Sequence, residues 1–80
     1  MEKTNTKVTR YQQGRFYIDI VDNGKEFEAW ITGKKYGVSD LMFGMPKKQA
    51  TEDITEEHFL ELVEASFAEY AAEYIEEYGI

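Results

Sequence analysis

The last third of the chain carries an apolar stripe at helical spacing, and this stripe constrains the fold more than any other feature. Between Thr55 and Tyr78, apolar residues recur about every 3.6 positions, as in an amphipathic helix. Thr55 suits the N-cap, Glu56 and Glu57 complement the positive end of the helix dipole, and Gly79 suits the C-cap. A helix over residues 55–78 needs a second apolar layer to cover its stripe, which comprises Phe59, Leu60, Val63, Phe67, Tyr70, Ala71, Tyr74 and Tyr78.

The residues before the helix supply that layer as antiparallel strands. Residues 15–21 and 26–32 alternate apolar and polar side chains around Asn23-Gly24, a dipeptide typical of tight hairpin turns. A two-residue loop there predicts three apolar pairs on one face of the sheet, namely Phe16 with Ile31, Ile18 with Ala29, and Ile20 with Phe27. On the other face the same register places Tyr17 opposite Trp30.

This register also predicts a pair of like charges, Asp19 opposite Glu28, which destabilises a sheet unless a cation lies near. Arg10 would lie diagonal to Asp19 if residues 7–12 formed a fourth strand, a possibility that the pattern leaves open. Residues 38–43 predict a further strand that stops before Pro46.

Together these patterns predict an α+β fold, in which a three- or four-stranded antiparallel meander is packed on one face by a long C-terminal helix. We expect one domain over residues 1–80, with a flexible N-terminus at 1–6, the sheet at 7–45, a connection at 46–54 and the helix at 55–78. A helix of this length runs about 34 Å and a seven-residue strand about 23 Å. The helix end at Tyr74–Tyr78 is therefore expected to extend beyond the sheet.

The composition argues against an enzyme. The chain has no cysteine and a single histidine, His58, so it lacks the residues for a nucleophile paired with a base or for a zinc site. The glycines form no phosphate-binding loop. The many carboxylates lie on an exposed helix face and share one environment, whereas acid–base catalysis needs two different environments. We expect no catalytic residue, no cofactor and no bound metal, and we expect His58 at the surface.

The net charge of −7 argues against binding to nucleic acid or to an anionic membrane surface. No stretch reaches the roughly 18 apolar residues of a membrane span, and residues 1–15 lack the apolar core of a signal peptide. We expect a cytoplasmic protein.

Charge is divided unevenly along the chain. All nine basic residues precede residue 52, together with six acidic ones, whereas residues 52–80 hold ten acidic residues and no Lys or Arg. Surface helices usually gain stability from Glu–Lys pairs four residues apart, and this helix instead carries like-charge pairs. Such a face suits a basic protein partner, and a row of carboxylates can imitate a phosphate backbone. The candidate partner-binding acids are Glu61, Glu64, Glu69, Glu73 and Glu76.

Aromatic residues suggest an alternative function. Tyr17 and Trp30 are expected on the uncovered face of the sheet, and Tyr78 at the overhanging helix end. Aromatic side chains are enriched in protein interfaces. The alternative to an interaction module with a basic partner is therefore a weak homodimer that uses the Tyr17/Trp30 face or the Tyr74/Tyr78 end, with the acidic surface serving solubility.

The segment EAWITGKKYGVSDLMFGMP, residues 28–46, resembles the central part of short uncharacterised proteins from bacterial conjugative transposons and related mobile elements. The Tyr36-Gly37 pair and the run from Met42 to Pro46 carry most of this resemblance. It implies a bacterial cytoplasmic accessory protein and supplies no mechanism.

Overall fold

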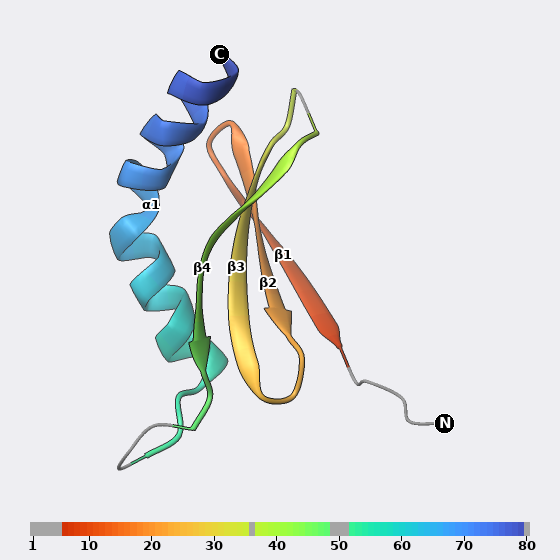
Figure 1. Cartoon of the computed structure of the whole chain (residues 1–80), viewed down its shortest axis with the longest axis vertical. Helices are drawn as coiled ribbons and strands as arrows, with labels where there is room; N and C mark the ends of the chain where they lie inside the picture. The colour runs from red at the N-terminus through yellow and green to blue at the C-terminus, as the bar shows by residue number, and fades with distance from the viewer. Residues whose placement is uncertain (1–5, 36, 49–51, 80) are drawn as a thin grey trace.

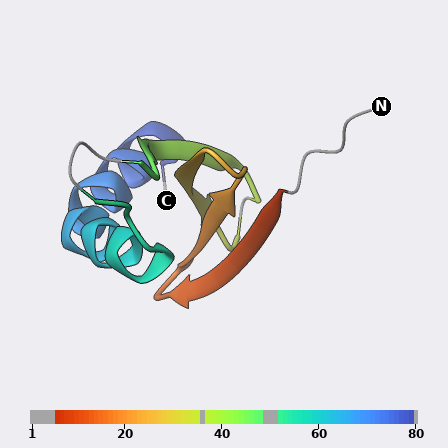
Figure 2. The same cartoon turned by 90° about the horizontal axis from the view of Figure 1, so that it is seen from below.

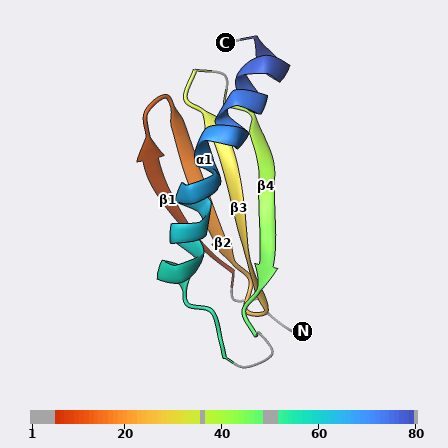
Figure 3. The same cartoon turned by 90° about the vertical axis from the view of Figure 1, so that its left-hand side faces the viewer.

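The computed structural model describes residues 6–35, 37–48 and 52–79. Its elements are β1 (Lys7–Gln13), β2 (Phe16–Asp22), β3 (Glu26–Gly33), β4 (Ser39–Pro46) and α1 (Glu56–Tyr78). The four strands form one antiparallel sheet in the order β1-β2-β3-β4 (Figure 1), and α1 crosses one face of it (Figure 3). The predicted α+β fold is confirmed, and β1 supplies the fourth strand. The predicted flexible N-terminus, apart from Thr6, lies outside the described residues.

The sheet curves around the helix. Seen from below, the strands form an arc whose inner side faces α1 (Figure 2). The core fills this space, with the ring of Phe59 lying between Phe27 and Phe43 at centroid distances of 5.3 Å to each. The buried apolar residues are Phe16, Ile18, Ile20, Phe27, Ala29, Ile31, Met42, Phe59, Val63, Ala71 and Tyr74.

The β2–β3 register differs by two residues from the predicted one. Ile18 lies opposite Ile31, where Ala29 was expected. Because side chains alternate along a strand, a shift of two leaves each side chain on the same face of the sheet. The predicted apolar face is therefore correct, although the predicted pairs are wrong.

Side-chain hydrogen bonds in the turn explain the shift. The Oδ1 atom of Asn23 accepts the backbone N–H groups of Lys25 and Glu26 at 2.9 Å each, and Asp22 Oδ1 accepts the N–H of Gly24 at 2.9 Å. These acceptors stabilise a longer turn, in which Gly24 takes a φ of 95°. Three residues, Asn23 to Lys25, therefore separate β2 from β3 where a loop of two was expected.

The helix begins and ends as predicted. Thr55 Oγ1 accepts the backbone N–H of His58 at 3.1 Å. At the other end Gly79 has a φ of 72°, and its N–H bonds to the carbonyl of Ile75 at 2.8 Å. Both caps satisfy backbone groups that a helix terminus leaves without partners.

The C-terminal end of α1 stays attached to the sheet, so the predicted overhang is wrong. The Tyr74 hydroxyl accepts the N–H of Gly33 at 2.9 Å and donates to the carbonyl of Val38 at 2.6 Å. The Tyr78 hydroxyl donates to Asp40 Oδ1 at 3.0 Å. The segment between β3 and β4 thus reaches the last turns of the helix. This contact needs a glycine at position 33, because a Cβ there would lie 2.8 Å from the Tyr74 ring.

Candidate functional site

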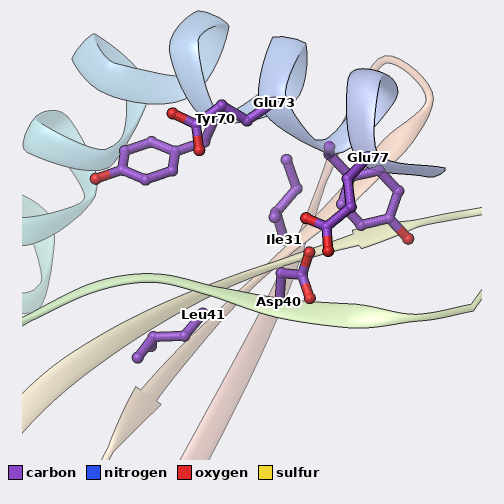
Figure 4. A pocket seen from close by; sticks show the side chains of 7 residues that line it. Ile31, Asp40, Leu41, Tyr70, Glu73 and Glu77 are labelled. Atoms are coloured by element: carbon purple, nitrogen blue, oxygen red, sulfur yellow. The ribbon is translucent and has the colours of Figure 1, made fainter. Parts of the chain in front are cut away.

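A groove lies between β4 and the C-terminal half of α1. It encloses about 260 Å³ and is lined by Ile31, Asp40, Leu41, Tyr70, Glu73, Tyr74 and Glu77 (Figure 4). Glu73 and Glu77 are exposed, so the groove opens to solvent. Apolar side chains and carboxylates thus meet in one depression.

An irregularity in β4 shapes the side of the groove that this strand forms. Ala29 pairs with Phe43 and Trp30 pairs with Leu41, which leaves Met42 as an extra residue in a β-bulge. Beyond the bulge, Asp40 lies opposite the buried residue Ile31 and so shares the face of the sheet that α1 covers. The bulge thereby permits both Met42 and Asp40 to face the helix.

The groove carries an excess of negative charge. Asp40 comes from β4, whereas Glu73 and Glu77 come from α1, and Figure 4 shows the carboxyl groups of Asp40 and Glu77 turned towards each other. Within the described part of the chain, none of these three residues forms an ion pair. No Lys or Arg of the described residues neutralises these three carboxylates, although Asp40 accepts a hydrogen bond from Tyr78.

Tyr78 donates a hydrogen bond to one carboxylate of the groove, that of Asp40. Its hydrogen bond to the Asp40 carboxylate, followed by burial and by the nearby negative charges, raises the pKa of Tyr78 to about 12. A hydrogen bond from a phenol to a carboxylate favours the neutral phenol, because the ionised form would repel its acceptor.

The mutation Asp40→Asn is expected to lower the pKa of Tyr78 towards its ordinary value of 10.0. A raised tyrosine pKa stabilises the fold fully below pH 10 and loses this contribution as pH rises towards about 12. The check is an NMR titration of the tyrosine ring carbons, with Tyr78→Phe to assign the resonance and circular dichroism to monitor folding. An unchanged Tyr78 pKa in the Asp40→Asn protein would contradict the role of Asp40.

The five predicted acids are all exposed, but they do not form one surface. Glu73 lines the groove, and Glu64 lies close enough to Tyr11 to contribute to its raised pKa, which is due mainly to burial of the phenol and to Glu56. Glu61, Glu69 and Glu76 remain, spaced about two helical turns apart. We call these three the outer ridge of α1.

The aromatic pair predicted for the outer face of the sheet does not form. Tyr17 lies opposite Thr32, and Trp30 lies opposite Asp19, so the expected Tyr17–Trp30 pairing is wrong. Both aromatic residues are half-buried. The Trp30 Nε1–H donates to a Glu28 oxygen at 3.2 Å.

Cations cover part of this face. Arg10 lies directly opposite Asp19 and donates two hydrogen bonds to its carboxylate, at 2.7 and 3.0 Å, which raise the pKa of Arg10. The Arg10 guanidinium also lies 4.5 Å from the centre of the Tyr17 ring, and Lys34 Nζ lies 5.2 Å from it. The sequence left Arg10 open as a cation diagonal to Asp19, and the fourth strand places it directly opposite Asp19. Arg10 also reduces the aromatic surface available to a partner.

A second depression, lined by Gly24, Lys25, Lys47, Lys48 and Asp53, lies beside the β2–β3 turn. Lys47 forms an ion pair with Asp22 at 2.6 Å, which lowers the pKa of Asp22. Part of the positive charge here is therefore neutralised within the protein.

The comparisons with known proteins give no identification. The chain matches no family model, no curated protein and no solved structure. Function is therefore inferred from the groove and from the outer ridge.

His58 lies at the surface, as expected. The described residues contain no cluster of three or more His, Cys, Asp or Glu arranged to bind a metal ion, and none of their helices is long and apolar enough to cross a membrane.

The sequence reasoning missed three side chains of the groove: Asp40, Tyr70 as a groove residue, and Glu77. A signal existed for one of them. Glu77 follows Phe59 by 18 positions, which is about five helical turns, so both point to the same side of α1. The helical period therefore predicts that Glu77 lies on the sheet-facing side of α1, apart from the outer ridge.

Proposed function

We propose that the protein is a small non-enzymatic interaction module that binds a basic protein partner through the exposed side of α1. The observation that carries this proposal is the separation of charge. The outer ridge and the groove present carboxylates to solvent, and none of them forms an ion pair with Lys or Arg within the described residues. The outer ridge and the groove thus both carry negative charge on α1.

Binding a basic partner would relieve a cost that is built into the free protein. Glu69 and Glu73, and likewise Glu73 and Glu77, are four residues apart on α1 and repel each other by about 0.2–0.5 kcal/mol per pair. Complementary charge on a partner removes this repulsion and accelerates encounter. Because a row of carboxylates resembles a phosphate backbone, we propose DNA-binding or nuclease-type proteins as the partner class. The resemblance of residues 28–46 to mobile-element proteins supports a cytoplasmic accessory role in bacteria.

The proposal predicts that reversing the charge of the outer ridge abolishes capture of the partner. The bait with Glu61→Lys, Glu69→Lys and Glu76→Lys is compared with wild type by affinity capture from bacterial lysate and mass spectrometry. We expect wild type to retain a basic protein that the variant loses. The complex should weaken above about 0.15 M salt, where exposed charges are screened.

A matched control separates the position of the charge from the total charge. Glu61→Lys with Glu69→Lys changes the net charge as much as Glu52→Lys with Asp53→Lys, and all four residues are exposed. Only the first pair is expected to weaken binding. Equal loss in both double variants, or equal retention of the same proteins by wild type and the triple variant, would argue against a role for the outer ridge.

One observation favours the alternative of a weak homodimer. Val8 and Leu41 are 58 % and 53 % exposed and belong to the two edge strands of the sheet. An apolar dimer would persist at high salt, unlike a charged complex. Sedimentation equilibrium over a range of salt concentrations distinguishes the two functions.

A further inference from the structure

The groove between β4 and α1 has an apolar wall that suits an alkyl chain. The half-buried ring of Tyr70 forms this wall, beside the buried side chains of Tyr74 and Ile31, whereas the Leu41 side chain points to the opposite face of β4 (Figure 4). An extended side chain lying against the Tyr70 ring would remove apolar surface from water, which stabilises a complex.

The end of the groove is negative. The carboxyl groups of Asp40 and Glu77 face each other there, with Glu73 also in the lining. Two neighbouring carboxylates favour a cation between them. Since the Tyr78 hydroxyl already bonds to Asp40 Oδ1, the second oxygen of Asp40 is left to accept a further donor. The occupant that fits both features has an apolar stem and a positive tip.

Arginine fits this description better than lysine. Its guanidinium is planar and carries several N–H donors, so one group can bridge two carboxylates and stack on a tyrosine ring. A lysine ammonium carries the same charge but is not a planar group, so it does not stack on a ring in this way. Its stronger hydration also makes transfer into a groove less favourable.

We infer that the groove binds an arginine side chain of the basic partner. The stem lies against Tyr70, and the guanidinium lies between Asp40 and Glu77. This inference rests on the proposed function, because it names the anchor by which a basic partner would hold α1. The outer ridge then provides long-range attraction, and the groove provides the specific contact.

The experiment is an NMR titration of isotopically labelled protein with the peptide acetyl-Gly-Arg-Gly-amide. Matched peptides carry citrulline, which has the shape of arginine without its charge, or lysine. We expect the arginine peptide to shift the amide signals of Asp40, Leu41 and Glu77 most strongly. The lysine peptide should bind more weakly, and the citrulline peptide should not bind.

Two double variants locate the site. Glu73→Gln with Glu77→Gln removes two charges from the groove, whereas Glu61→Gln with Glu69→Gln removes two from the outer ridge, and all four residues are exposed on α1. Losing two exposed charge contacts should weaken arginine binding about tenfold in the groove variant. The outer-ridge variant should bind the peptide almost as wild type does.

The outcomes separate this inference from the proposed function. Equal binding by both double variants, shifts confined to the outer ridge, or equal binding of arginine and citrulline would overturn the groove as an arginine site. The capture experiment with the outer-ridge variant would still test, independently, whether the outer ridge binds a basic partner. Conversely, arginine binding in the groove together with failed capture would support the site and reject the outer ridge.

Discussion

Replacing Phe59 with alanine is expected to remove about half of the stability of the protein. Phe59 is 0 % exposed, and its ring contacts both Phe27 and Phe43. Truncating a buried phenylalanine costs about 3–5 kcal/mol, because it removes apolar contacts and leaves a cavity. The total free energy of unfolding of a chain of 80 residues is only about 4–12 kcal/mol.

Urea unfolding followed by far-ultraviolet circular dichroism measures this effect. Ile75→Ala is the matched control on the same helix, because Ile75 is 36 % exposed, and its loss should cost less than about 1 kcal/mol. A Phe59→Ala protein with the unfolding midpoint of wild type would mean that α1 does not depend on this ring for its attachment to the sheet.

The second large effect is expected for Tyr74→Phe, which removes a single oxygen atom. The Tyr74 hydroxyl joins the N–H of Gly33 to the carbonyl of Val38, at 2.9 and 2.6 Å. Phenylalanine keeps the ring but leaves the buried N–H of Gly33 without an acceptor. An unpaired buried donor costs about 1–3 kcal/mol.

Tyr74→Phe also affects the groove, because Val38 is followed closely by Asp40 in β4. We expect faster amide hydrogen exchange at Ser39 and Leu41 as well as a lower unfolding midpoint. Tyr70→Phe is the control, since within the described residues the Tyr70 hydroxyl makes no hydrogen bond. If both variants unfold at the same urea concentration, the hydroxyl bridge does not hold the turn.

The helix was predictable because its signals are local. The caps at Thr55 and Gly79 depend on residues within a single turn, and the apolar stripe follows from the helical period. Strand alternation likewise identifies the buried face of β2 and β3 without knowledge of the exact pairing. These features tolerate a wrong register, because a two-residue shift leaves the faces unchanged.

The register and the groove depend on interactions that the pattern of apolar residues does not encode. Asn23 and Asp22 change the length of the β2–β3 turn through side-chain hydrogen bonds. The groove brings together Asp40 of β4 and Glu77 of α1, which are far apart in sequence. The β-bulge at Met42 helps to turn Asp40 towards the helix. The bulge is an extra residue in one strand, which the apolar pattern does not mark, so neither residue stood out as a partner of the other.

The absence of lysine from α1 has a practical consequence for biochemical work. Every lysine precedes Thr51, so amine-reactive dyes, crosslinkers and sensor-chip chemistry modify no lysine side chain on the helix. Immobilisation through lysine leaves the outer ridge and the acidic wall of the groove chemically unaltered, whereas carboxyl activation would destroy both. Crosslinking a basic partner to this surface therefore calls for reagents that join carboxylates to amines.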